Sequence, residues 1–319
     1  MNTGVKITAF AAALAATFGT AYGVGKGVGP VGEPTKAEHA QAGHAAHEEA
    51  DAGGGTAPAA GGLQVSEGGY TLALATPKTA VGTSVLKFAV KDAGGRNVTA
   101  YRTEHGKELH FIVASRDLTV FRHLHPVRAA DGTWSTPVDL PAAGAYKVFA
   151  DFTPAAEGAK GVTLGADVSV PGAYAPQPLP AVAPTAEVDG YQVRLGGTLD
   201  PGRSGELKLT VTKAGKPVTN LEPYLGAYGH LVALREGDLA YLHVHPNEGG
   251  PGPDVSFTAT APSAGAYRLF LDFQHEGKVR TAAFTVYAGG KGVTAGATET
   301  AGTRGTGEAA HDAGGHAHG

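Results

Sequence analysis

The chain has 319 residues, enough for two domains of ordinary size, and its net charge is −4 at pH 7. It contains no cysteine, which excludes disulfides, thiolate zinc sites and iron–sulfur centres, and its single methionine, Met1, excludes thioether copper sites. The acidic balance and the absence of basic runs argue against a nucleic-acid partner. Because 14 histidines are present, a bound metal would be held by imidazole with help from carboxylates.

The N-terminal segment contains an uncharged stretch, 7–25, of 19 residues between Lys6 and Lys26. At about 1.5 Å per residue, a helix of this length just spans a hydrocarbon core of roughly 30 Å. Residues 1–32 are therefore predicted to be an uncleaved membrane anchor or a signal peptide, and we expect the anchor because the small-x-small site at 19–21 is not the strong Ala-x-Ala form. Both interpretations place the rest of the chain outside the cytoplasm, membrane-anchored or secreted.

Two segments, 33–62 and 289–319, are rich in alanine, glycine and charge and contain almost no large apolar side chains. Such segments bury too little surface to offset the entropy of ordering, so both are predicted to be disordered. Their histidines either collect metal weakly or are simply solvated. These residues are His39, His44, His47, His311, His316 and His318.

The central part of the chain is a duplication. Segment 144–152, GAYKVFADF, matches GAYRLFLDF at 265–273, a shift of 121 residues. A period of this length indicates a repeated domain, since solenoid repeats run at roughly 20–50 residues. Five prolines between Pro171 and Pro184 predict a stiff linker. The predicted domains are 63–172 and 187–288, joined by the linker 173–186.

Each copy contains seven short alternating runs bounded by Gly, Pro, Asn or Asp, and none with a helical apolar period over three turns. This rhythm predicts an all-β fold of two tandem immunoglobulin-like β-sandwiches. The runs of the first copy are 70–75, 84–91, 108–115, 119–125, 133–139, 144–152 and 162–170. Those of the second copy are 190–195, 205–212, 229–235, 239–245, 254–260, 265–273 and 278–287.

The pattern His-x12-His-x-His-Pro occurs once in each copy. Aligned without gaps, the windows 109–126 and 229–246 share only four identical residues, which are the three histidines and the proline. A repeat that differs everywhere except at its imidazoles indicates a function of imidazoles, and a divalent metal is the first candidate. The predicted metal ligands are His110, His123, His125, His230, His243 and His245.

The two strands that carry each motif are expected to form a hairpin. A two-residue loop at 116–117 would place His110 directly opposite His123, and a loop at 236–237 would do the same in the second copy. The third histidine, two residues further along the same strand, would project from the same face. Each copy would then present three imidazoles, enough for one divalent ion at about 2.0–2.1 Å from each nitrogen. A loop of odd length would instead move His110 to the other face.

The His-x-His-Pro segments also fit polar edge strands that end at proline, with imidazoles solvated or bonded to backbone. Asp151 and Asp272 lie between aromatic residues, and each either orients a ligand imidazole through its second nitrogen or lies on the solvent side of an edge strand. His105 is a candidate fourth ligand of the first site, where the second copy has Leu225. His275 has no counterpart in the first copy and is expected at the surface.

With HLHP at 123–126, HVHP at 243–246 and the repeated GAY segments, the chain resembles exported, often membrane-tethered bacterial proteins with duplicated immunoglobulin-like domains. These lie near the periplasmic copper-resistance carriers and the YtkA-like proteins. The resemblance covers about residues 70–287, and it implies a β-sandwich fold and the handling of metal, chiefly copper, outside the membrane. The chain lacks the methionines and the N-terminal histidine ligand of the copper carriers.

The leading hypothesis is an extracytoplasmic, non-enzymatic protein that binds Cu or Zn through a patch of three histidines in each domain, with no protein partner identified. One alternative is a cell-surface interaction module whose histidines are structural. Another is a zinc hydratase or hydrolase with three histidine ligands, which also needs a shaped pocket and a proton acceptor. Since imidazole must be neutral to ligate, metal binding is expected to weaken as the pH falls through about 6.5.

Overall fold

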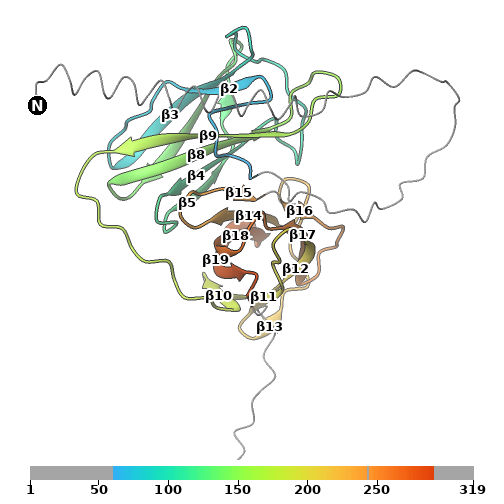
Figure 1. Ribbon diagram of the computed structural model, residues 1–319. Helices are drawn as coiled ribbons and strands as arrows, with labels where there is room; N and C mark the ends of the chain where they lie inside the picture. Colours follow the sequence, from blue (N-terminus) through green and yellow to red (C-terminus); the bar gives the residue numbers. More distant parts are fainter. Residues whose placement is uncertain (1–59, 243, 291–319) are drawn as a thin grey trace, which may run out of the picture. The chain divides into compact units, whose positions relative to one another are not determined.

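The computed structural model describes residues 60–242 and 244–290, and every regular element within them is a β-strand. In the first copy, a five-stranded sheet of order β1-β2-β3-β7-β6 and a four-stranded sheet of order β5-β4-β8-β9 form a sandwich (Figure 1). Its strands are β1 (Ser66–Glu67), β2 (Tyr70–Leu74), β3 (Gly82–Lys91), β4 (His110–Ser115), β5 (Phe121–Leu124), β6 (Val127–Arg128), β7 (Thr133–Leu140), β8 (Gly144–Phe152) and β9 (Val162–Val170).

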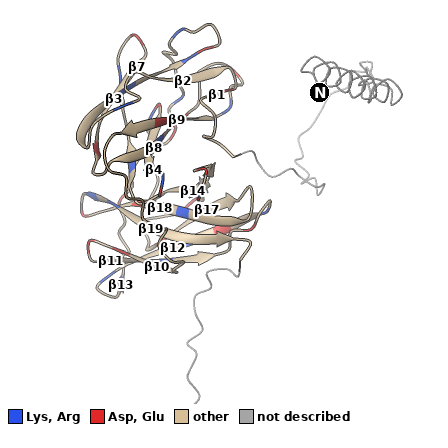
Figure 2. Ribbon diagram, turned by 60° about the vertical axis from the view of Figure 1, so that its left-hand side comes forward, with Lys and Arg blue, Asp and Glu red and all other residues tan. Residues whose placement is uncertain are grey.

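The second copy repeats this arrangement. One sheet has the order β10-β11-β12-β17-β16, with β13 added at β12, and the other has the order β15-β14-β18-β19. Charged residues of both signs are spread over the strands and loops of both copies (Figure 2). The strands are β10 (Thr185–Val188), β11 (Tyr191–Gly197), β12 (Ser204–Lys213), β13 (Lys216–Pro217), β14 (His230–Arg235), β15 (Tyr241–Leu242), β16 (Val244–Pro246), β17 (Asp254–Thr260), β18 (Gly265–His275) and β19 (Lys278–Ala288).

Both copies are immunoglobulin-like sandwiches, so the predicted fold class is confirmed. In the first copy β2, β3 and β7 correspond to strands A, B and E of that fold, and β5, β4, β8 and β9 to strands C′, C, F and G. Alternation along β7 buries every second residue, as a strand with one face on the core requires. Phe88 of β3 stacks on Phe111 of β4 across the two sheets, with ring centroids 4.4 Å apart.

All fourteen predicted runs overlap a strand, whereas the short strands β1, β6, β10 and β13 were not predicted. The predicted N-terminal helix and most of the two predicted disordered segments lie outside the described residues. Among residues 60–242 and 244–290, no helix is long and apolar enough to cross a membrane.

The two copies contact each other through the same face of their four-stranded sheets. Phe121 stacks on Phe270 at a ring-centroid distance of 4.0 Å, and Tyr241, the equivalent of Phe121, contacts Phe149, the equivalent of Phe270, at 5.6 Å. Equivalent residues therefore make equivalent contacts, as in an isologous interface. The buried apolar cluster formed there, separate from the two sandwich cores, consists of Ile112, Ala114, Leu118, Phe149, Val232, Leu234, Leu239, Tyr241 and Phe270.

The hairpin register differs from the predicted one in both copies. Ile112 lies opposite His123, and in the second copy Ala233 lies opposite Leu242. The predicted direct opposition of His110 and His123 is therefore wrong, by a shift of two residues, because each loop has four residues and not two. An even shift keeps every side chain on its expected face, whereas a shift of one would have reversed them.

The end of the segment predicted to be disordered is part of the folded structure. Gly61 pairs with Tyr241 through two backbone hydrogen bonds of 3.1 and 2.9 Å, at the outer edge of β15. Gly62 has a φ of +69°, and a Cβ atom there would lie 2.4 Å from the Phe149 ring. A Cβ atom on Gly165 would lie 1.9 Å from the Gly62 carbonyl oxygen. Only glycine allows this close approach, which covers the free edge of β15.

The proline-rich connection runs along the interface between the copies. The Gln177 amide donates a hydrogen bond to the Asp117 carboxylate over 3.0 Å, and Leu179 packs against the interface cluster. Strand β10 begins at Thr185, inside the segment predicted as linker. These contacts, together with the fixed backbone of its prolines, give the connection a defined path.

Candidate metal centre

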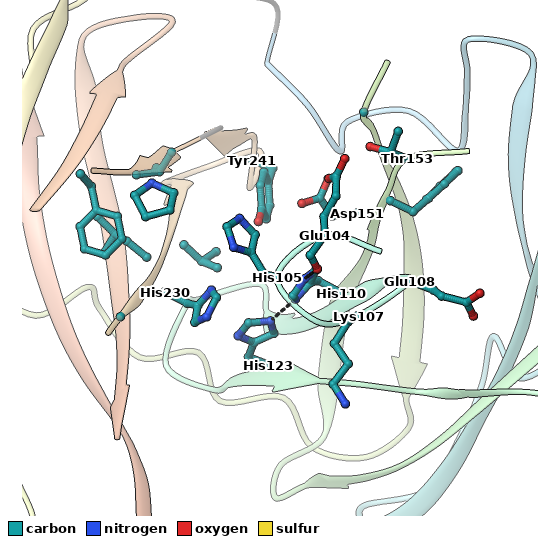
Figure 3. Close-up of a pocket in the computed structure, with 18 of the residues that line it drawn as sticks. Glu104, His105, Lys107, Glu108, His110, His123, Asp151, Thr153, His230 and Tyr241 are labelled. Carbon is teal, nitrogen blue, oxygen red and sulfur yellow. Dashed lines mark hydrogen bonds between the residues drawn. The ribbon is translucent and has the colours of Figure 1, made fainter. Parts of the chain in front are cut away.

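Three histidines of the first copy converge at one end of its four-stranded sheet. His110 is the first residue of β4, His123 lies on β5, and His125 follows the end of that strand. One ring nitrogen of each lies within 4.8 Å of the other two. Figure 3 shows His110 and His123 directed at each other. The structure therefore brings together the three candidate ligands of the first motif, because the even register shift leaves them on one side of the hairpin.

Hydrogen bonds determine which nitrogens of His110 and His123 can accept a cation. His110 Nε2 lies 3.2 Å from the Glu104 carbonyl oxygen, and His123 Nδ1 lies 2.8 Å from the Asp272 carboxylate. Both oxygens are acceptors, so both of these nitrogens carry hydrogen. The remaining nitrogens, His110 Nδ1 and His123 Nε2, then both present lone pairs, and they face each other at 3.1 Å. Two facing lone pairs at this distance require a cation, either a proton or a metal ion.

His125 adds a ring nitrogen that has no hydrogen-bond partner in the part of the chain that the structure describes. Its Nε2 is buried and has no hydrogen-bond partner among the described residues. Its Nδ1 lies 3.4 Å from the Tyr224 hydroxyl, which comes from the second copy. A buried polar nitrogen left unpaired costs about 1–3 kcal/mol, and a bound ion would remove that cost.

The environments of His110, His125 and His230 favour the neutral form of each imidazole, because the pKa of each is lowered. Burial, followed by the nearby His123 ring, lowers the pKa of His110 to about 4. Burial lowers the pKa of His125 to about 3, with smaller contributions from His123 and His110. The pKa of His230 is also lowered, again mainly by burial. Competition between protons and a metal at these nitrogens should therefore begin at a lower pH than the reference value of about 6.5 implies.

The second copy contributes to the same cluster. His230, at the start of β14, donates its Nε2 hydrogen to the Tyr224 carbonyl over 2.8 Å, as His110 does to Glu104. Its ring centroid lies 6.2 Å from that of His110 and 6.1 Å from that of His123. His230 of the second copy therefore lies beside His110 and His123 of the first copy.

The remaining candidate ligands of the second motif are only partly described. His243 lies outside the described residues. His245 is described only as backbone, and it pairs with Thr258 where β16 has moved to the other sheet of the sandwich. The predicted patch of three histidines in the second copy stays a prediction.

Asp272 orients a candidate ligand, and it does so from the other copy. Its Oδ2 accepts the hydrogen bond from His123, and its Oδ1 accepts one of 2.5 Å from the Thr281 hydroxyl. Asp272 is 4% exposed and lies on the inner strand β18, so the alternative of a solvent-facing edge position is wrong for it. Its counterpart Asp151 lies on the inner strand β8 and accepts a hydrogen bond of 2.8 Å from Thr163.

His105 lies at the rim of the cluster. It occupies a tight turn closed by two backbone hydrogen bonds between Glu104 and Lys107, with a φ of +49°. Its ring centroid is 5.4 Å from that of His230 and 6.3 Å from that of His110. The exposed ring thus borders both copies, and it is not among the three histidines whose nitrogens lie within 4.8 Å.

The cluster opens into a cavity of about 370 Å³. His110, His123 and His230 line it together with Asp151 and Tyr241 (Figure 3). A volume of this size holds water or a small ligand beside the imidazoles.

Two features of the cluster were not predicted from the motif. One is the Tyr224 hydroxyl, and the other is the pair of carbonyl groups, at Glu104 and Tyr224, that bind the first histidine of each motif. A signal was available, because a glycine follows two residues later in both copies, at Gly106 and Gly226, which marks the same turn. His275, expected at the surface, is instead 6% exposed.

Both ring nitrogens of His275 lie within hydrogen-bond distance of side chains of the second copy. Its Nδ1 lies 2.7 Å from the Tyr191 hydroxyl, and its Nε2 lies 3.1 Å from the Asn220 side-chain oxygen. The prediction of a surface position failed because β18 extends to His275 and packs it beneath the start of β11. This residue lies outside the cluster.

A family model described as "Domain of unknown function (DUF8832)" matches residues 64–170 and again residues 186–290. Among solved structures, the chain is similar to a DUF4426 family protein from Pseudomonas aeruginosa PAO1 at 10% identity, covering 32% of this chain and 91% of that one with a TM-score of 0.24. It is also similar to InvD from Yersinia pseudotuberculosis at 13% identity, covering 69% and 57% with a TM-score of 0.23. None of the curated proteins matches the chain significantly. The resemblance to copper carriers and YtkA-like proteins stays a prediction.

Proposed function

The chain belongs to the DUF8832 family, and we propose that it binds a divalent transition-metal ion through His110, His123 and His125. The observation that carries the proposal is the pair of facing acceptor nitrogens on His110 and His123, 3.1 Å apart. Each is forced into the acceptor role because the other nitrogen of its ring donates to an oxygen. The ring of His125, whose Nε2 is buried and has no hydrogen-bond partner among the described residues, lies 4.8 Å from the His123 ring between centroids.

Cu(II) or Zn(II) is the proposed ion. All three ligands are imidazoles, which suit these ions, and the chain contains no cysteine. A carboxylate behind a ligand imidazole, as Asp272 lies behind His123, is the usual outer partner of such a site and raises the basicity of the ligand. We propose that the protein carries this ion outside the cytoplasm, tethered or secreted through its N-terminal segment.

Calorimetric titration with Zn(II) and Cu(II) at neutral pH tests the proposal. The protein would be the full chain, purified without an affinity tag, with the six tail histidines replaced by alanine to remove weak sites. We expect one equivalent of the ion to bind at the first-copy site, and its binding to require His123. Absence of binding by Cu(II), Zn(II), Ni(II) and Co(II) would falsify the metal proposal and leave a proton shared between His110 and His123.

A second candidate function is a cell-surface interaction module with structural histidines. It is favoured by the bonds from His110 and His230 to the carbonyls of Glu104 and Tyr224, since each histidine closes a turn onto its strand. In that case the protein, purified without chelator, would contain no stoichiometric metal by elemental analysis. An enzymatic role, which we do not propose, would appear as turnover of carbon dioxide or of an activated ester.

A further inference from the structure

We infer that the metal site is shared between the two copies, with His230 as an additional ligand and Asp272 as a positioning residue. The inference rests on the proposed function and extends it. The three histidines that converge most closely all come from the first copy. The second copy supplies the oxygen that orients one of them and a fourth imidazole beside them.

The hydrogen bonding of His230 leaves its Nδ1 available. Its Nε2 hydrogen is donated to the Tyr224 carbonyl, so Nδ1 is the acceptor nitrogen of a neutral ring. This is the same arrangement as in His110, whose Nδ1 faces His123. The ring of His230 lines the cavity together with those of His110 and His123 (Figure 3).

Asp272 already connects the two copies at this point. The Asp272 carboxylate accepts a hydrogen bond from Thr281 of its own copy. It also accepts a hydrogen bond from His123 of the first copy. His230 and Asp272 are paired neighbours on β14 and β18, so one segment of sheet presents both groups to the first copy. A site with ligands from both copies follows from the face-to-face packing of the four-stranded sheets.

The apolar interface brings these groups together before any ion binds. The stacked rings of Phe121 and Phe270 and the buried cluster around them hold the copies at contact distance. An ion bound by residues of both copies then stabilises their contact, because a ligand that binds only the docked state shifts the equilibrium toward it. Metal binding would thus join two domains of one chain.

Titration of the full chain with Co(II), followed by its visible absorption, tests the inference. The test variants are His230→Gln and Asp272→Asn. His275→Gln serves as a control for a buried histidine of the same copy outside the cluster, and Asp167→Asn serves as an exposed carboxylate control. We expect His230→Gln to weaken Co(II) binding by at least about tenfold and to change the ligand-field spectrum. Asp272→Asn should weaken it by roughly 10–100-fold, with an altered spectrum that a purely structural role would leave unchanged.

The outcomes separate the inference from the proposed function. Unchanged affinity and spectrum in His230→Gln would overturn the shared site while leaving the site of three histidines in place. Failure of the unaltered chain to bind Co(II), Zn(II) or Cu(II) would instead remove the proposed function. Should His230→Gln fail to fold, ¹⁵N-histidine NMR of the unaltered chain decides the question. Zn(II) should shift the His230 Nδ1 resonance, and an unmoved resonance with shifted His110 and His123 would overturn the inference.

Discussion

The two copies share one backbone arrangement at the first motif histidine, but the side chains around that histidine differ. In both, the first motif histidine begins a strand and donates Nε2 to the carbonyl six residues earlier, at Glu104 or Tyr224. In the first copy, β5 continues past His123 to Leu124 before the chain leaves the sheet. In the second, Val244, the equivalent of Leu124, already belongs to β16 and pairs with Ala259 in the other sheet. A repeat can therefore keep a turn and the strand that begins at it while a later strand changes sheet.

Removal of a histidine from the first copy should have the largest effect on metal binding. His123→Ala removes one of three proposed ligands, and an equal share of a zinc binding free energy of about 10–16 kcal/mol is about 4 kcal/mol, or roughly a thousandfold in affinity. Zn(II) calorimetry on the full chain measures the loss. His275→Gln, which leaves the cluster intact, should bind as the unaltered chain does. Equal loss in both variants would contradict the assignment.

A second test exchanges a glycine of the first copy for its counterpart in the second. Gly165 lies opposite Phe149, and Ala283 occupies the equivalent place opposite Phe270. Gly165→Ala should destabilise the protein by about 3 kcal/mol, because the new methyl group would meet the Gly62 carbonyl 1.9 Å away. Urea unfolding measures the change. Ala283→Gly is the reciprocal control, with an expected loss of about 1 kcal/mol, and a tolerated Gly165→Ala would show that Gly62 does not occupy this position.

The pH dependence of stability should differ between variants of His110 and variants of His230. Both have a pKa lowered by burial, so the unfolded state binds more protons below about 6.5 and stability falls as the pH falls. For His110, with a folded pKa of about 4, the loss between pH 6.5 and 4 should be on the order of 2 kcal/mol. The free energy of unfolding of the metal-free protein, measured in urea across this range, should depend less steeply on pH in His110→Asn than in the unaltered chain. The reduction in steepness should be smaller in His230→Asn. An unchanged slope in His110→Asn would show that its imidazole is solvated.

The smallest expected effect concerns the residue that differs between the two turns. Tyr224 stands where the first copy has Glu104, and its hydroxyl lies 3.4 Å from His125 Nδ1. Tyr224→Phe should weaken metal binding by less than about 1 kcal/mol, since a hydrogen bond at this distance contributes little. Calorimetry with Tyr228→Phe, a half-buried tyrosine of the same copy, provides the baseline. A tenfold loss in Tyr224→Phe would give the hydroxyl a larger role in orienting His125.

Local pattern alone predicted the strands and the faces of the motif histidines. Alternation and turn residues predicted fourteen runs that each overlap a strand. The period-two geometry of a strand kept His110 and His123 on one face although the loop was two residues longer than expected. The loop length itself was not predicted, because Leu118 and Leu239 adopt left-handed backbone conformations that their residue type does not signal. The orienting role of Asp272 was one of two alternatives, and the sequence contained no reason to prefer it.

The all-β fold, the duplication, the strand faces and the candidate histidines could be predicted from the amino-acid sequence, since all of these depend on local periodicity and on comparing the two halves. Three features are seen only in the folded protein: the four-stranded sheets face each other, Asp272 of one copy orients His123 of the other, and His230 lies beside the first cluster. These three features could not be predicted because their contacts join residues as many as 149 positions apart in the sequence, across an interface between two sheets. No local periodicity specifies which face of one sandwich meets which face of the other.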